Sequence, residues 1–221
     1  MSAGLEAMRD SMDHRGPEFG EFTLSILERL KTVFKTEGPV ITYPSSGTGA
    51  WEAALVNTLS PGDRVLMFET GQFATLWQEL AGRLGLVVDM VEGDWRHGVS
   101  AGEVESRLSE EKDHAIKAVC VVHNETSTGV VSNVAAVRTA MDAASHPALL
   151  FVDTISSLAS VDYRHDEWGV DVTVSGWDAA LESIEGAARP AVRLGLSMLR
   201  GMKDDAAERI ERARAVRPFL G

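Results

Sequence analysis

With 221 residues and a net charge of −12, the chain can bury the core of one α/β domain, and its acidity argues against nucleic acids and anionic membranes as partners. Its one cysteine, Cys120, excludes an internal disulfide and lies in an apolar run where a small buried side chain is expected. No apolar stretch is long enough to cross a bilayer and the N-terminus has no apolar signal segment, so we expect a cytoplasmic protein.

Helical apolar spacing and short β-branched runs alternate along most of the chain. The first helix is predicted from an apolar face formed by Phe22, Ile26, Leu27, Leu30, Val33 and Phe34. Further helices are predicted over 47–59, 73–84, 101–109 and 134–144, and strands over 39–43, 64–68, 86–91, 116–122, 148–152 and 170–174. Because the strands are nearly continuous apolar runs, we expect an α/β fold with a mostly parallel sheet covered by helices on both faces.

The character of the chain changes after Gly176. Residues 178–220 contain no strand candidate, and we predict a helical tail that Pro190 breaks or kinks. We therefore divide the chain into an α/β part, 1–176, and a helical C-terminal segment, 177–221. A parallel sheet that stopped at residue 176 would leave an exposed edge, which the tail could cover.

A run of small and hydroxyl residues follows the first predicted strand. Ser46-Gly47-Thr48-Gly49 opens a helix, where free backbone N–H groups and hydroxyls suit a phosphate group. The run lacks the lysine of a nucleotide triphosphate loop. The alternative is a helix start built from small residues and no ligand.

Polar residues also follow two later strands. Asp153 ends the buried strand over 148–152, where a carboxylate is costly without a positive partner such as a protonated pyridine nitrogen; the alternative is a cap on the turn over 154–157. The stretch His123–Gly129 faces the same edge, and its alternative is a plain polar turn. His123 has no companion at metal-ligand spacing, so we predict no metal site.

The three polar sites, taken together in their order along the chain, resemble the pattern of a known family. Residues 10–176 resemble the class V aminotransferases that depend on pyridoxal phosphate (PLP), in particular the serine–glyoxylate and alanine–glyoxylate branch. The matching stretches are SGTGAWEAAL (46–55), LSPGD (59–63), GQF (71–73), VHNETSTGV (122–130), FVD (151–153) and WGVDV (168–172).

The resemblance implies the large-domain fold of the type I PLP-dependent transferases and a set of cofactor contacts. Ser46, Gly47 and Thr48 would hold the PLP phosphate, and Thr126 would bond the polar edge of the ring. Asp153 would pair with the pyridine nitrogen. The two ring faces would be covered by Phe73 and Ile155.

The chain departs from the family after Ser175-Gly176, where a Ser-Gln-Lys sequence is expected and Trp177-Asp178-Ala179 stands instead. Ala179 can neither form a Schiff base nor carry a proton, so no catalytic residue is predicted. Trp177 is bulky, and Asp178 would repel a phosphate. The C-terminal domain that binds the substrate carboxylate has no match in this chain.

Three functional hypotheses remain open. The first is a PLP-dependent aminotransferase that moves an amino group from serine or alanine to glyoxylate, inactive alone without the lysine. The second is a non-catalytic homologue that binds PLP noncovalently or dimerises with an intact relative. The third is a truncated or frameshifted product whose residues 177–221 have no selected function. The family implies a homodimer with amino acid and 2-oxo acid substrates.

Overall fold

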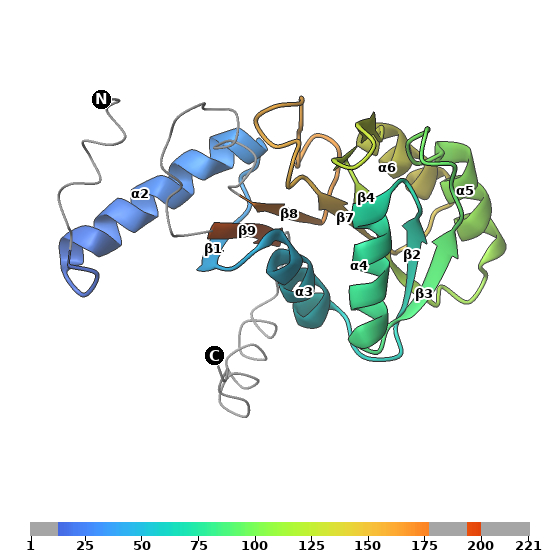
Figure 1. Cartoon of the computed structure of the whole chain (residues 1–221), viewed down its shortest axis with the longest axis horizontal. Coiled ribbons are helices and arrows are strands. Elements are labelled where there is room, and N and C mark those ends of the chain that lie inside the picture. The colour runs from blue at the N-terminus through green and yellow to red at the C-terminus, as the bar shows by residue number, and fades with distance from the viewer. Residues whose placement is uncertain (1–12, 177–193, 200–221) are drawn as a thin grey trace.

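A seven-stranded sheet is the centre of the computed structural model, which describes residues 13–176 and 194–199 (Figure 1). The strands follow the order β1-β9-β8-β7-β4-β2-β3. They are β1 (Val40–Pro44), β2 (Arg64–Phe68), β3 (Val87–Val91), β4 (Ile116–Val122), β7 (Leu149–Asp153), β8 (Val172–Gly176) and β9 (Leu194–Leu199). Strands β8, β7, β4, β2 and β3 are mutually parallel, and β9 is antiparallel to both of its neighbours.

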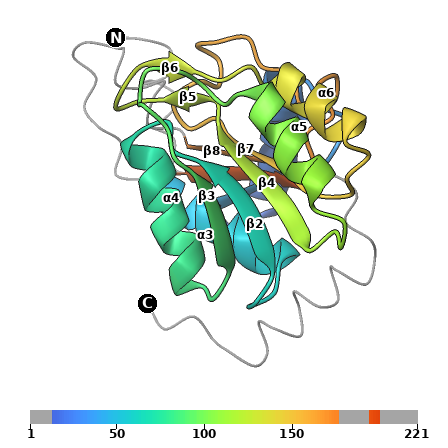
Figure 2. The same ribbon diagram turned by 90° about the vertical axis from the view of Figure 1, so that its right-hand side faces the viewer.

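Helices lie on both faces of this sheet (Figure 2). The helices of the described part are α2 (Pro17–Phe34), α3 (Gly47–Thr58), α4 (Gln72–Arg83), α5 (Ala101–Glu110) and α6 (Val134–Ala143). A small hairpin, β5 (Asn124–Glu125) with β6 (Val130–Val131), follows β4. The α/β architecture and the elements predicted between residues 39 and 174 are confirmed, with this hairpin as an addition.

The two faces of the sheet bury separate cores because side chains alternate along each strand. Along β4, Val119 and Val121 pack in the core under α5 and α6, whereas Ala118, Cys120 and Val122 pack in the core under α3 and α4. Cys120 is buried, as its apolar surroundings predicted. Strands that are apolar on both sides therefore account for the continuous apolar runs in the sequence.

The predicted apolar face of the first helix is buried only in part. Leu30 and Phe34, near its C-terminal end, are buried in the core, whereas Phe22, Ile26 and Val33 are exposed. The helix extends away from the sheet, so its N-terminal half has no described surface against which to pack (Figure 1). None of the described helices combines the length and the apolar character that crossing a membrane requires.

The prediction of a tail without a strand is wrong at Leu194–Leu199. This segment forms β9, which fills the position between β8 and β1 and pairs with both. Within the described residues β1 has no strand neighbour other than β9, so the sheet does not stop at β8 as expected. The rest of the predicted helical segment, 177–193 and 200–221, lies outside the described residues.

Candidate functional site

The polar sites predicted from the sequence meet at one edge of the sheet. Parallel strands bring their carboxyl ends to the same edge, where ligands of open α/β sheets bind. The loops after β1, β2, β4 and β7 contribute the predicted residues, and β8 ends there at Gly176. The fold therefore collects segments that are far apart in the chain.

The start of α3 supplies the predicted phosphate contacts. Ser46 caps the helix by accepting a 3.4 Å hydrogen bond from the Gly49 N–H, so the predicted start of a helix at this position is confirmed. The first N–H groups of a helix have no acceptor within it, so those of Gly47 and Thr48 remain suited to an anion. A Cβ atom at Gly47 would overlap Ile155 Cδ1, so a larger residue at this position would require the Ile155 side chain to move.

Asp153 is buried at the end of β7 with both carboxylate oxygens hydrogen-bonded. Oδ1 accepts from the Ile155 N–H at 2.7 Å and so caps the following turn, and Oδ2 accepts from the Trp51 indole N–H at 2.8 Å. Burial raises the pKa of Asp153 to about 7, although these two bonds lower it, and the charge of Glu125 adds to the rise. The Trp51 and Ile155 donors are both neutral, so neither of them balances the negative charge of the ionised carboxylate.

Ile155 connects Asp153 to the other predicted segments. Its side chain lies against Gly47, and a Cβ atom at Gly176 would lie 3.6 Å from its Cγ2. The end of β7 is bonded to the end of β8 by Thr154, whose N–H donates to the Val174 carbonyl at 2.8 Å. The strand that leads toward the predicted lysine position therefore ends beside the predicted phosphate site. Trp177, Asp178 and Ala179 themselves lie outside the described residues.

Phe73 lies in the first turn of α4, half-exposed, with its ring edge-on to Trp51 at 6.5 Å. This turn begins at Gly71, which has no side chain with which to cap it. Glu125 replaces the missing cap from the β5–β6 hairpin. Its Oε1 accepts from the Phe73 N–H at 3.3 Å and its Oε2 accepts from the Ala74 N–H at 3.1 Å.

The stretch after β4 divides into structural and exposed residues. His123 is buried, its Nδ1 is 2.9 Å from the Ser157 hydroxyl, its ring contacts Tyr163, and burial lowers its pKa. Asn124 donates to the Ser156 hydroxyl at 2.8 Å. Thr126 remains exposed in the turn next to Glu125, beside the start of α4. The polar-turn interpretation is confirmed for the backbone, and Thr126 keeps a free surface for a ligand.

Two residues of this site were not predicted from the sequence, Trp51 and Glu125. Trp51 lies in the second turn of α3, stacks on Trp77 at 5.7 Å with an interplanar angle of 13°, and is 2% exposed. It links Phe73 to Asp153, so two of the predicted cofactor contacts share one neighbour. A tryptophan four residues after Gly47, on the inner face of a helix, was the available signal.

Glu125→Gln is expected to lower the free energy of unfolding by about 2–3 kcal/mol. Glu125 is fully buried and its two oxygens bond two N–H groups at the start of α4, whereas the amide NH₂ of glutamine would face one of those donors. Urea denaturation measures the difference. Glu52→Gln, on the exposed side of α3, is the matched control, and equal midpoints for both variants would contradict the capping role.

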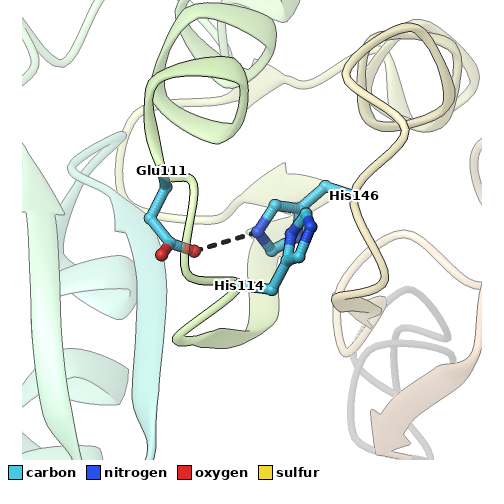
Figure 3. Close-up of side chains that lie close together, drawn as sticks. All are labelled: Glu111, His114 and His146. Atoms are coloured by element: carbon cyan, nitrogen blue, oxygen red, sulfur yellow. Dashed lines mark hydrogen bonds and ion pairs between the residues drawn. The ribbon is translucent and has the colours of Figure 1, made fainter.

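A second cluster lies at the opposite edge of the sheet. Glu111, His114 and His146 come from the loops before β4 and β7 (Figure 3), and their possible ligand atoms lie within 4.8 Å of one another. The Ala148 N–H donates to His146 Nδ1 at 3.2 Å, so the proton is on Nε2, which lies 3.0 Å from Glu111 Oε2. A hydrogen bond from the Ala115 N–H, with those from His146 and Ile116, lowers the pKa of Glu111 to about 2. The hydrogen bond between Glu111 and His146 therefore connects the loop before β4 to the loop before β7.

Comparison with known families gives two matches along the chain. The profile of the class-V aminotransferase family matches residues 5–177. That of a helix-hairpin-helix motif matches residues 168–221, a range that includes β9. The first match ends beside the change of character predicted after Gly176.

Several curated proteins are similar in sequence. A serine–glyoxylate aminotransferase of Arabidopsis thaliana is 49% identical over 174 residues, which is 78% of this chain and 43% of that protein. An L-aspartate–glyoxylate aminotransferase of Paracoccus denitrificans is 47% identical over 211 residues, 95% of this chain and 51% of that protein. The chain thus spans about half the length of the curated relatives it matches.

Solved structures are similar in fold. A ureidoglycine–glyoxylate aminotransferase from Bacillus subtilis gives a TM-score of 0.79 at 25% identity, covering 98% of this chain and 52% of that one. An alanine–glyoxylate aminotransferase from Nostoc gives 0.78 at 29% identity, covering 97% and 52%. Both solved structures are aminotransferases, in agreement with the sequence resemblance.

Proposed function

Because the chain belongs to the class-V aminotransferase family, we propose that the edge formed by the loops after β1, β2, β4 and β7 binds pyridoxal phosphate or pyridoxamine phosphate without a covalent bond. The proposed contacts are Ser46, Gly47, Thr48, Phe73, Thr126, Asp153 and Ile155. The single observation that carries the proposal is Asp153, a buried carboxylate with two neutral donors and a raised pKa.

The residues fit the charge distribution of such a cofactor. Its phosphate is an anion and suits the N–H groups at the start of α3, while its pyridine nitrogen is cationic when protonated and suits Asp153. Gly47 lies directly against the Ile155 side chain, because a Cβ atom at Gly47 would overlap Ile155 Cδ1. Ile155 is two residues from Asp153 in the sequence. Phosphate and ring contacts are therefore neighbours.

When bound, the cofactor would supply an electron sink for bonds at the substrate α-carbon. The protein must also hold and move a proton there. Ala179 has only a methyl group, so this chain offers no amine at the position where the family has its lysine. We therefore propose that the chain holds the cofactor and that its turnover alone is negligible.

The substrates of the whole protein follow from its relatives as a proposal. Their names differ in the amino donor, which is serine in one and L-aspartate in another, and they agree on glyoxylate. We propose glyoxylate as the acceptor and serine or alanine as the donor, in a cytoplasmic homodimer. A noncatalytic homologue that pairs with an intact relative is the second candidate, because Ala179 removes the lysine while the described contacts remain.

A truncated or frameshifted product is the third candidate. The change of sequence after Gly176 supports it, and resequencing the gene tests it. The alignment with the Paracoccus relative extends past Gly176, and the helix-hairpin-helix match also includes the tail. An intact reading frame would remove this candidate.

The proposed binding is tested by titrating the purified chain with pyridoxal phosphate, then reducing with borohydride and mapping any modified lysine by mass spectrometry. We expect saturable binding without one specific adduct, because the lysine is missing. An adduct on one lysine would instead show that another amine replaces it and would restore the enzyme hypothesis for this chain. Absence of binding would overturn the proposal.

A further inference from the structure

Trp51 is placed between two parts of the proposed cofactor site. Its indole N–H donates to Asp153 Oδ2 at 2.8 Å, and its ring meets the Phe73 ring edge-on at 6.5 Å. Trp51 is 2% exposed and Asp153 is 4% exposed, so water has little access to the bond between them. A hydrogen bond in such surroundings fixes the orientation of a carboxylate more strongly than one in water does.

We propose that Trp51 is a positioning residue, whose indole N–H holds the Asp153 carboxylate in the orientation and the ionised form that a cationic ring nitrogen requires. The inference rests on the proposed function, because it assigns Asp153 as the partner of that nitrogen. Trp51 is buried, so it would act on the cofactor through its hydrogen bond to Asp153 and not by direct contact.

The geometry supports this role in two ways. The Ile155 N–H already bonds Oδ1, so the Trp51 N–H fixes the second oxygen and prevents the carboxylate from rotating. A donor to the ionised carboxylate also favours that form, since burial and the charge of Glu125 oppose it. Asp153 would then be prepared to receive a cation before the cofactor arrives.

Trp77 distinguishes positioning from packing. It is buried, stacks on Trp51 and comes from α4, but its own indole N–H has no partner among the described residues. Trp51→Phe and Trp77→Phe therefore remove similar volumes from one aromatic stack. Only the first removes a hydrogen bond to Asp153.

The decisive experiment titrates Asp153 in the cofactor-free chain by NMR of ¹³C-labelled aspartate carboxyl groups, with Asp153→Asn identifying the signal. Trp51→Phe is expected to raise the titration midpoint by about one pH unit, as the loss of a hydrogen bond to a charged group implies. Trp77→Phe is expected to leave it unchanged. If both variants or neither move the midpoint, the proposal is overturned.

A second variant tests the same hydrogen bond in case the Trp51→Phe chain does not fold. Replacing Trp51 by benzothienylalanine exchanges the N–H for sulfur and keeps the shape of the ring, so the same midpoint shift is expected. In the titration of pyridoxamine phosphate at neutral pH, either Trp51 variant should bind about tenfold more weakly than the Trp77→Phe chain. If the unaltered chain does not bind the cofactor, the proposed function fails, whereas the NMR midpoint still decides the role of Trp51.

Discussion

Asp153→Asn is expected to weaken the binding of pyridoxamine phosphate by about 100-fold at pH values above the Asp153 pKa of about 7. A neutral amide cannot form a charge-assisted bond with the protonated ring nitrogen. The amide has one oxygen and so can accept from only one of the two donors, Trp51 or Ile155. Isothermal titration calorimetry measures the change in affinity.

The pH dependence gives the same variant a second readout. In the unaltered chain, binding should strengthen as pH rises toward and through 7, because Asp153 loses its proton and gains the charge that attracts the cation. In Asp153→Asn this dependence should disappear. Asp113→Asn, an exposed change of the same chemistry, is the control, and equal affinities for both variants would refute the pairing.

Asp153 also lowers the stability of the cofactor-free chain at neutral pH. Its pKa is raised from 3.8 to about 7 by burial, so between these values the folded chain binds more protons than the unfolded chain. The contribution of Asp153 to the free energy of unfolding should therefore fall as pH rises from about 4 to 7, and Asp153→Asn should lack that slope. A residue that destabilises the empty protein is typical of a functional site.

Leu196→Pro in β9 is expected to lower the free energy of unfolding by at least about 3 kcal/mol, a large share of the 5–15 kcal/mol typical of a domain. Leu196 is paired with Thr42 of β1 on one side and with Ser175 of β8 on the other. Because β9 is an inner strand, each of its N–H groups points toward one of these neighbours, and proline has none to donate.

The consequences of this substitution should extend to the proposed phosphate site. Only one residue separates the end of β1 at Pro44 from Ser46, and β1 is held in the described sheet through β9. We expect faster hydrogen exchange of the β1 amides and weaker cofactor binding. Leu196→Val, which keeps the N–H, is the control, and equal urea midpoints with protected β1 amides would contradict the role of β9.

Much of the fold could be predicted from the sequence because its signals are local. Apolar runs bounded by turns indicated the strands β1 to β4, β7 and β8, and helical spacing indicated α3 to α6. The strand β9 was missed because a six-residue apolar run has no clear period, and its structure depends on two partners that lie far away in the chain.

The candidate site divides in the same way. Ser46–Thr48 and Asp153 could be predicted because each follows a strand in a recognisable motif. Trp51 and Glu125 could not, because their partners are 102 and 51 residues away in the sequence. The exposure of Phe22 and Ile26 could not be predicted either, because helical spacing shows which residues share a face of a helix and not what packs against that face.

The pairing of β1 with β9 also affects how the chain folds during synthesis. Val40 leaves the ribosome long before Met198, its partner in the register, so β1 has no strand to pair with until β9 has been synthesised. The parallel strands β2, β3, β4 and β7 can associate first, with β1 joining last. A nascent chain that stalls before residue 194 would carry two unpaired strand edges, β1 and β8, and would be most exposed to aggregation at that stage.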